Sequence, residues 1–339
     1  MRAEPPSPAT RGPTLQVYDG AWPDGIEALS TLRQASFFHG AVWAGAVQRA
    51  LPRHAPFVLA THGPDGALQG ACAFAAVRRW GVLRLYAGPL GTYGGIVATT
   101  TAAETALADA LAALPERRRL ALVRVHDFAG GTAARLGALP RWHTAPESCQ
   151  VLDLPGDPQE LFQHAFTAQN RNKIRKAERA GLTVRRSADA AALTAYAALY
   201  RAALPRWQVR RALPAALFAA LAGGAGVDVW LAERTGEPVA ALLNLRGGGQ
   251  IMNWGNVSRP EAWHDAPNNL LHWRAIEAAC RDASGPRLYN FGSSAGLPGV
   301  QAFKAAFGTR VHSYRRLEYR AAWLGPATAL RGLGRRRRT

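Results

Sequence analysis

The sequence predicts an α/β (α+β) protein made of two tandem units, each a mixed, mainly antiparallel sheet flanked by helices. Three observations support this class. Short apolar runs of strand type alternate with stretches of helical periodicity along the chain. The same order of elements occurs twice. The 339 residues, of which 48% are hydrophobic, are enough to build two cores.

The first copy is expected to span residues 14–154, after a proline-rich leader at 1–13 that is predicted to be disordered. Its hairpin turns at Pro64–Gly66, where proline, aspartate and glycine favour a tight turn. In chain order the copy is expected to contain a strand at 15–19, helices at 24–34 and 41–51, the hairpin at 56–77, a strand at 82–88, the loop GPLGTYGG, a helix at 99–114, a strand at 119–127, a short helix at 131–138 and a strand at 148–154.

The second copy is expected to span residues 182–322 and repeats that order. Its expected elements are a strand at 182–187, helices at 189–203 and 214–222, a hairpin at 227–245, a strand at 250–257, a helix at 267–282, a strand at 287–291, a helix at 300–307 and a strand at 311–319. Matching elements begin at 15 and 182, 67 and 238, 82 and 250, and 119 and 287, with offsets of 167, 171, 168 and 168. Such constant spacing indicates that one folding unit of about 150 residues occurs twice.

A basic segment at 155–181 separates the copies and has no counterpart in the first. Asp157 is a suitable N-cap, Pro158 suits the first helical position and Gly181 can end the run, which predicts one helix or two over 158–180. Cationic side chains crowd this segment: Arg171, Lys173, Arg175, Lys176 and Arg179. They indicate either a binding site for a polyanion or a solvated helix surface with Glu178 as its counter-charge.

Charge is the strongest signal in the composition. The chain has 41 Lys and Arg against 23 Asp and Glu, a net charge of +18. Residues 151–339 hold 27 basic and 13 acidic side chains, so this half alone carries +14. The excess favours RNA, nucleotide phosphates or anionic lipid headgroups as partners, although a solvated basic surface remains an alternative. The basic tail at 323–339, with its RRRR run, is expected either to contact membrane phosphate or RNA or to be inert.

Several classes are disfavoured. Cys72, Cys149 and Cys280 are far apart and show no ligand spacing, which supports neither a disulfide framework nor a metal site. The chain starts without the apolar core of a signal peptide, and no run approaches the roughly 20 apolar residues that cross a bilayer. We therefore expect a cytoplasmic protein, with peripheral contact at the inner face of the membrane as a further expectation.

The stretch from Leu288 to Gly308, LYNFGSSAGLPGVQAFKAAFG, reads as a strand, a glycine-rich loop and a helix. Gly292 permits close approach of the backbone to a bound group, and Gly308 can take the left-handed conformation that ends a helix. Lys304, one of only three lysines in the chain, lies on this helix beside an apolar stripe. Either it is an ordinary solvated lysine or it presents a compact ammonium group to a site.

The order of elements in each copy is that of the GNAT acyltransferase fold, so the fold class becomes two tandem GNAT-like acyltransferase domains. Two stretches, QNRNKIRKAERAGLTVRR and YNFGSSAGLPGVQAFKAAFG, resemble motifs of FemAB-like proteins, and GPLGTYGG resembles that group too. This double-GNAT group includes the aminoacyltransferases that build peptidoglycan bridges and the broader BioF2-like acetyltransferase domain. The resemblance covers residues 14–320.

This resemblance implies an enzyme of cell-wall biogenesis. The best-known relatives take an amino acid from aminoacyl-tRNA and form an amide on an amine of a nucleotide- or lipid-linked precursor. By resemblance, Lys304 matches the family lysine that supports the donor's terminal ribose or ester carbonyl. The role is chemically reasonable, because aminolysis passes through an oxyanion that a fixed ammonium stabilises more than it stabilises the neutral carbonyl.

The chain departs from the family pattern at Asn290, where the family usually has an aspartate. Asn290 can bind a substrate but cannot act as a base. Asp127, at the end of a strand in the first copy, is the candidate for accepting the proton of the acceptor amine, or else it caps the next helix. The remaining candidates for substrate contact lie at predicted strand ends and in the glycine loops: Tyr93, Trp254, Asn256, Ser293 and Ser294.

The identity of the donor stays open between alternatives. GNAT enzymes that use acyl-CoA need a glycine-rich pyrophosphate loop at the start of the long helix. The second copy has RPEAWHDAPNNLLHW there, without glycine, and the first has GTYGGIVATT, without a basic partner. This favours aminoacyl-tRNA as co-substrate, with no tightly bound cofactor and no metal. The alternatives are an acyl-CoA-dependent N-acetyltransferase acting on an amino sugar or polysaccharide precursor, and a non-catalytic scaffold that binds RNA or membrane.

Overall fold

A computed structural model describes residues 12–117, 119–208, 212–283 and 285–324. Most of the predicted leader (1–13) and of the basic tail (323–339) lies outside these residues. Within them, no helix is long and apolar enough to cross a bilayer. The same part of the chain contains no group of three or more His, Cys, Asp or Glu that could hold a metal ion.

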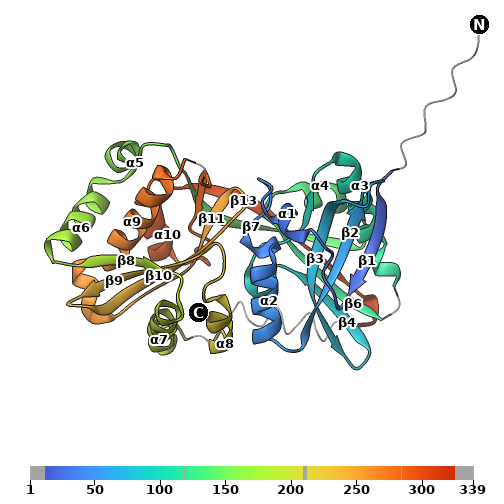
Figure 1. Ribbon diagram of the computed structural model, residues 1–339, viewed down its shortest axis with the longest axis horizontal. Coiled ribbons are helices and arrows are strands. Elements are labelled where there is room, and N and C mark those ends of the chain that lie inside the picture. Colours follow the sequence, from blue (N-terminus) through green and yellow to red (C-terminus); the bar gives the residue numbers. More distant parts are fainter. Residues whose placement is uncertain (1–11, 118, 209–211, 284, 325–339) are drawn as a thin grey trace, which may run out of the picture. The chain divides into compact units, whose positions relative to one another are not determined.

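The predicted α/β class is confirmed, since helices and strands follow one another in the expected order (Figure 1). The first half contains β1 (Thr14–Asp19), α1 (Ile26–Ser30), η1 (Phe37–His39), α2 (Ala41–Ala50), β2 (His54–His62), β3 (Leu68–Arg79), β4 (Val82–Ala87), β5 (Ile96–Ala98), α3 (Thr101–Ala113), β6 (Leu120–Asp127), α4 (Gly131–Leu136) and β7 (Trp142–Asp153). The second half contains α5 (Pro158–Glu160), η4 (Leu161–Ala165), α6 (Ala168–Arg179), β8 (Thr183–Ser187), α7 (Ala190–Trp207), α8 (Ala215–Leu221), β9 (Val227–Arg234), β10 (Glu237–Gly247), β11 (Gln250–Ser258), η5 (Pro260–Asp265), α9 (Pro267–Arg281), β12 (Leu288–Asn290), α10 (Pro298–Ala305) and β13 (Arg310–Arg320).

The predicted internal repeat is visible in the strand pairing. In the first half β2, β3 and β4 pair antiparallel in sequence, and β4 then pairs parallel with β6. In the second half β9, β10 and β11 pair antiparallel in sequence, and β11 then pairs parallel with β12. Two copies of one topology therefore underlie the near-constant offsets in the sequence.

The chain forms two compact units that are not simply its two halves. The first unit contains residues 1–29, 54–145 and 315–339, and the second contains 30–53 and 146–314. The last strand of each copy contributes to the other unit. The second part of β13 pairs antiparallel with β6 in the first unit, and the end of β7 pairs antiparallel with β12 in the second. The sequence repeats at 14–154 and 182–322 thus exchange their final strands.

Helices cover both faces of the sheet in the second unit. One face packs against α9 through a core that includes Trp230, Leu242 and Ile276. Alternate residues of a strand point to opposite sides, so Leu231 and Leu243 belong to the other face, where α7 contacts the same strands. Helix α2, which comes from the first half of the sequence, packs against α8 in this unit. This contribution was not predicted, because the periodicity of α2 shows that it is amphipathic but not which sheet it covers.

Candidate functional site

The parallel pairing of β11 and β12 is short and ends at a break in the strand geometry. It runs from Gln250–Leu288 to Met252–Asn290 and stops there. In the antiparallel pairing on the other side of β11, the register shifts so that Trp254 has no partner residue on β10. Such bulges often lie beside active sites because they re-aim side chains. Ligands of open α/β sheets bind outside the carboxyl ends of parallel strands, which makes this edge the expected site.

The loop after β12 is held by buried hydrogen bonds from its own residues. The side chain of Asn290, fully buried, donates to Gln250 Oε1 (3.1 Å) and accepts from the backbone N–H of Gly292 (2.8 Å). Gly292 has a φ of +72°, a conformation that side chains with a Cβ rarely adopt. Asn290 was predicted as a substrate contact; in the structure its side-chain amide links β11 to the loop after β12. The aspartate that it replaces would accept the same N–H but could not donate to Gln250.

Lys304 is buried, and its ammonium group holds the same loop from the other side. Nζ donates to the carbonyl oxygens of Gly292 (2.8 Å) and Ser293 (2.9 Å), and only 7% of the residue is exposed. Burial lowers the pKa of Lys304 from 10.5 to about 8. An ammonium donates three hydrogen bonds, so one N–H of Lys304 remains that no described residue accepts. The interpretation of Lys304 as a solvated surface lysine is therefore wrong.

Gln150 of β7 ties the loop to the start of β13. Its amide donates to Gln301 O (3.2 Å) and Thr309 Oγ1 (3.0 Å), and its carbonyl accepts from the hydroxyl of Ser294 (2.8 Å). Ser293 is exposed, and its hydroxyl accepts the backbone N–H of Ala295 (3.2 Å). Of the two predicted contact serines, Ser293 thus faces solvent while Ser294 fixes the loop.

A buried histidine that sequence reasoning missed links β11 to this region. In His272 of α9, Nδ1 lies 3.1 Å from the hydroxyl oxygen of Tyr289, and Nε2 lies 3.1 Å from the amide nitrogen of Asn256. Its ring stacks on Phe291 and also contacts Phe303 and Phe307. Burial, helped by the charge of Lys304, lowers the pKa of His272 to about 3, so this imidazole is neutral at physiological pH.

Asn256 is left with one unsatisfied polar atom. Its nitrogen is placed by His272, whereas its Oδ1 is buried and has no hydrogen-bond partner in the structure. A buried polar atom without a partner is costly, at about 1–3 kcal/mol, and such atoms often belong to binding sites. Asn256 therefore combines a fixed orientation with an open hydrogen-bonding position, as expected of a substrate-binding residue.

The two stretches that resemble family motifs are brought into direct contact. Asn170 at the start of α6 is buried, donates to Ala306 O after α10 (3.2 Å) and accepts from the amide of Asn269 in α9 (2.8 Å). The backbone N–H of Thr167 also donates to Ala306 O (3.0 Å). Gly308 has a φ of +75°, and a Cβ there would lie 2.8 Å from the carbonyl oxygen of Ala165. The basic helix therefore begins where the Lys304 helix ends.

The cationic face of α6 is smaller than the sequence predicts. The predicted segment 158–180 forms two helical pieces, because Phe166 is extended and Thr167 caps α6 through Asn170 N (3.2 Å). Arg171 donates to the carbonyl oxygens of Phe166 and Gln163, so it closes the preceding turn. Arg175 lies over the ring of Phe162 at 5.5 Å.

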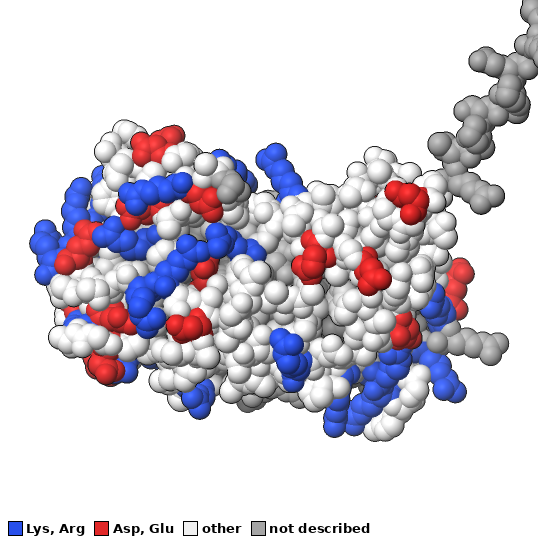
Figure 2. Space-filling view, in the orientation of Figure 1, with Lys and Arg blue, Asp and Glu red and all other residues white. Residues whose placement is uncertain are grey.

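Three exposed cations of α6 form no ion pair with a described residue: Lys173, Lys176 and Arg179. We call this group the α6 cationic face. The nearby Glu178, the predicted counter-charge, is instead paired with Arg274 of α9 (2.9 Å). In Figure 2, blue side chains gather over the end of the second unit where α6 lies in Figure 1, with acidic groups among them.

Comparison with known proteins agrees with this architecture. Residues 165–305 match the family model described as an acetyltransferase (GNAT) domain. The crystal structure of FemX is similar to this chain with a TM-score of 0.71 at 15% identity, over 89% of this chain and 97% of FemX. The chain has the double-GNAT fold of the FemAB-like proteins. The predicted resemblance is thereby confirmed for the fold, and the family-model match lies in the second half of the chain.

Two other solved structures are similar to this chain over most of their length. The C-terminal domain of a putative lysylphosphatidylglycerol synthetase from Agrobacterium fabrum has a TM-score of 0.59 at 11% identity, with 90% of this chain and 93% of that one covered. A tandem GNAT protein from the clavulanic acid biosynthesis pathway has a TM-score of 0.50 at 15% identity, with 91% and 98% covered. At these identities the likeness concerns the fold alone. No curated protein sequence matches the chain.

Two candidates lie in the first GNAT unit, where the structure shows their local roles. Asp127 accepts the backbone N–H groups of Gly130 (3.1 Å) and Ala133 (2.6 Å), as expected of the helix-capping alternative. Burial raises the pKa of the Asp127 carboxyl, and these hydrogen bonds oppose that increase. Tyr93 is 3% exposed and packs its ring 4.6 Å from that of Phe128.

Trp254, the bulged residue of the second GNAT unit, belongs to an aromatic cluster. Its ring lies 5.2 Å from that of Trp43 in α2 and 6.3 Å from that of Phe218 in α8. Gly255 follows, and a Cβ there would lie 1.8 Å from the hydroxyl of Tyr196. The half-buried Trp254 is thus held in place by helices from both halves of the sequence.

Proposed function

We propose that the protein is an acyltransferase that forms an amide bond on an amine of a cell-envelope precursor, with aminoacyl-tRNA as its donor. The observation that carries this proposal is the buried ammonium of Lys304, fixed by two loop carbonyls with one N–H to spare. The family-model match and the double-GNAT fold support an acyl donor and an amine acceptor. The resemblance of the sequence motifs to the aminoacyltransferases that build peptidoglycan bridges makes a peptidoglycan precursor the acceptor class to be tested first.

The proposed step is aminolysis of an ester. The neutral acceptor amine attacks the carbonyl carbon of the donor, a C–N bond forms, and the carbonyl electrons move to oxygen. The free N–H of Lys304 donates to this oxyanion, which is more basic than the starting carbonyl and therefore binds the ammonium more strongly. The C–O bond to the ribose then breaks, and the proton lost by the amine ends on the departing ribose hydroxyl. Asn256 Oδ1 accepts an N–H of the reacting groups, which supplies its missing partner.

The α6 cationic face is the proposed contact for the phosphates of the donor. Asn170 fixes α6 to the end of the Lys304 helix, so a polyanion lying on α6 would approach that helix from its C-terminal side. Exposed cations that lack acidic partners release counterions when they bind nucleic acid, which makes affinity depend on salt.

A double substitution tests this contact. Lys173→Gln together with Lys176→Gln is expected to weaken tRNA binding about five- to tenfold and to reduce the slope of log affinity against log salt by about 1 to 2 units, since each cation neutralises one phosphate. Filter binding over a range of salt concentrations gives both values. The matched control is Arg53→Gln with Arg141→Gln, two exposed arginines of the first half of the sequence. Equal losses in both variants would mean that net charge alone binds RNA.

The donor itself is identified by direct competition. We expect label to pass to envelope amines from a mixture of charged tRNAs and not from labelled acetyl-CoA, with uncharged tRNA as inhibitor of the reaction. Nucleotide-linked peptidoglycan precursors, lipid-linked precursors and amino sugars serve as acceptors in parallel. Transfer from acetyl-CoA with no effect of tRNA would contradict the proposed donor and leave the acyltransferase assignment in place.

One observation favours acyl-CoA as the second candidate donor. Helix α9 begins at Ala266, which has a φ of +54° and provides no side-chain cap, with Pro267 in the first position. Backbone N–H groups at the start of a long helix suit a pyrophosphate, although here Pro267 has no N–H and that of Asn269 donates to Ala266 O (3.1 Å). The segment before them contains no glycine, so backbone approach there is less easy than in typical acyl-CoA sites.

A further inference from the structure

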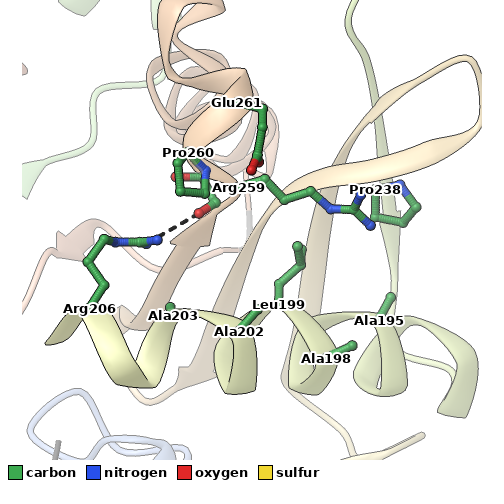
Figure 3. A pocket seen from close by; sticks show the side chains of 11 residues that line it. Ala195, Ala198, Leu199, Ala202, Ala203, Arg206, Pro238, Arg259, Pro260 and Glu261 are labelled. Carbon is green, nitrogen blue, oxygen red and sulfur yellow. Dashed lines mark hydrogen bonds between the residues drawn. The ribbon is translucent and has the colours of Figure 1, made fainter. Parts of the chain in front are cut away.

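A trough on the surface of the second unit has no part in the reaction proposed above. It is a cavity of about 600 Å³ between α7 and the segment that joins β11 to η5. Figure 3 shows α7 below, and Arg259, Pro260 and Glu261 above it. We call this cavity the α7 trough; its floor consists of residues of α7 that recur at helical spacing, namely Ala195, Ala198, Leu199, Ala202 and Ala203.

The floor of the α7 trough is apolar and the rim is charged. Small side chains and Pro238 leave no side-chain hydrogen-bonding group on the floor or on that wall. At the rim, Arg206 donates to Ser258 O (3.4 Å), whereas the side chains of Arg259 and Glu261 form no ion pair or hydrogen bond with any described residue. A ligand for this shape has an apolar chain and an anionic end.

One tryptophan beside the rim is largely exposed, and a second follows Arg206 in the sequence. Trp263 is 51% exposed, lies under the guanidinium of Arg206 at 4.9 Å, and donates through Nε1 to Ser258 Oγ (3.0 Å). Trp207, the last residue of α7, is 42% exposed. Tryptophan and arginine side by side on a surface are typical of groups that sit at the headgroup level of a membrane.

We propose that the α7 trough docks the protein on a membrane by holding one acyl chain of an anionic phospholipid, with the phosphate at the guanidinium of Arg259, which makes no ion pair with a described residue (Figure 3). A peptide or sugar on the alanine floor would lose hydrogen bonds to water that the floor cannot replace, whereas an alkyl chain has none to lose. Arginine suits the phosphate because its planar fork donates two parallel hydrogen bonds. Glu261 lies on the same rim and repels the headgroup, so its charge limits the affinity.

This docking does not depend on which donor the enzyme uses, so it is tested by binding alone. The full-length protein is sedimented with vesicles of phosphatidylcholine that contain about one third phosphatidylglycerol, an anionic lipid. The ionic strength is about 0.15 M, which screens long-range attraction between the basic protein and the anionic surface. Arg259→Gln is expected to weaken binding about fivefold, and Glu261→Gln to strengthen it by a similar factor, since each charge near an anionic surface has an effect of that size.

Two matched substitutions on α7 distinguish binding of the lipid acyl chain in the trough from simple charge attraction. Ala202→Glu places a carboxylate on the floor of the α7 trough, and Ala191→Glu makes the same charge change at an exposed position near the start of α7. We expect the first to reduce binding at least tenfold and the second less than threefold. Circular dichroism checks that both variants are folded.

Each result decides for or against the proposal. Selective loss in Ala202→Glu, with opposite effects of Arg259→Gln and Glu261→Gln, supports it. Equal binding by all variants would assign membrane contact to the basic tail at 323–339 and overturn the proposal. Inhibition of vesicle binding by millimolar inorganic phosphate, with no effect of Ala202→Glu, would show that the rim recognises phosphate without a lipid chain and would also overturn it.

Discussion

Replacing Lys304 with methionine is expected to reduce transfer about 10²–10³-fold, the loss typical of removing one oxyanion donor. Methionine has nearly the same length and shape as lysine but no charge and no N–H. The carbonyl oxygens of Gly292 and Ser293 would lose their donor, and the cost of burying a charge would vanish with it. We therefore expect the variant to stay folded. The measurement is the single-turnover rate of amide formation beside a thermal unfolding curve.

A second substitution separates the charge of Lys304 from its support of the loop. Lys304→Gln keeps an amide N–H that can donate to one loop carbonyl but carries no charge. If the ammonium stabilises the oxyanion, this variant is as slow as Lys304→Met although its loop is better held. Full activity in Lys304→Gln would show that the lysine only shapes the loop and would remove the central support of the proposed mechanism.

The elements of the fold were predictable because each depends on local pattern. The turn at Thr235–Gly236 has positive φ at both positions, as the sequence Thr-Gly before the second run of β-branched and apolar residues suggests. The placement of α2 and the exchange of β7 and β13 were not predictable, since they depend on contacts between residues more than 130 positions apart. Local periodicity contains no information about such partners.

The site was predictable where a residue's role follows from its own neighbours in sequence. Lys304 stood out because it is a lysine on an apolar helix that follows a glycine loop. His272 could have been noticed as a polar residue on the buried face of α9, but buried histidines of that kind are common, and its partners Tyr289 and Asn256 belong to other elements, 17 and 16 positions away. The hydrogen bonds of Arg171 to the preceding turn were not predictable, because a long cationic side chain can turn back onto its own backbone, which charge counting ignores.

Transfer is expected to fall above about pH 8, because the active form of Lys304 is the ammonium. Burial lowers the pKa of Lys304 from 10.5 to about 8, so each further pH unit removes about nine-tenths of the remaining charged form and the rate falls close to tenfold. The acceptor amine must be neutral to attack, which makes the rate rise towards that pH from below. The profile of kcat/KM is therefore bell-shaped, and its descending limb belongs to the enzyme.

The variant Lys304→Arg tests whether the fall of kcat/KM above pH 8 is caused by deprotonation of Lys304. The guanidinium of Lys304→Arg keeps its proton throughout this range, so the slower variant should lack the descending limb. Rates must be corrected for hydrolysis of the donor ester in base.

The pH dependence of stability tests the lowered pKa of Lys304 independently. Between pH 8 and 10.5 the lysine binds more protons in the unfolded protein than in the folded one, so its contribution to the free energy of unfolding increases with pH. The cost of burying the charge is complete below pH 8 and is relieved towards pH 10.5. The difference in unfolding free energy between the wild type and Lys304→Met should follow that course, and a difference that stays constant from pH 7 to 10 would contradict the lowered pKa.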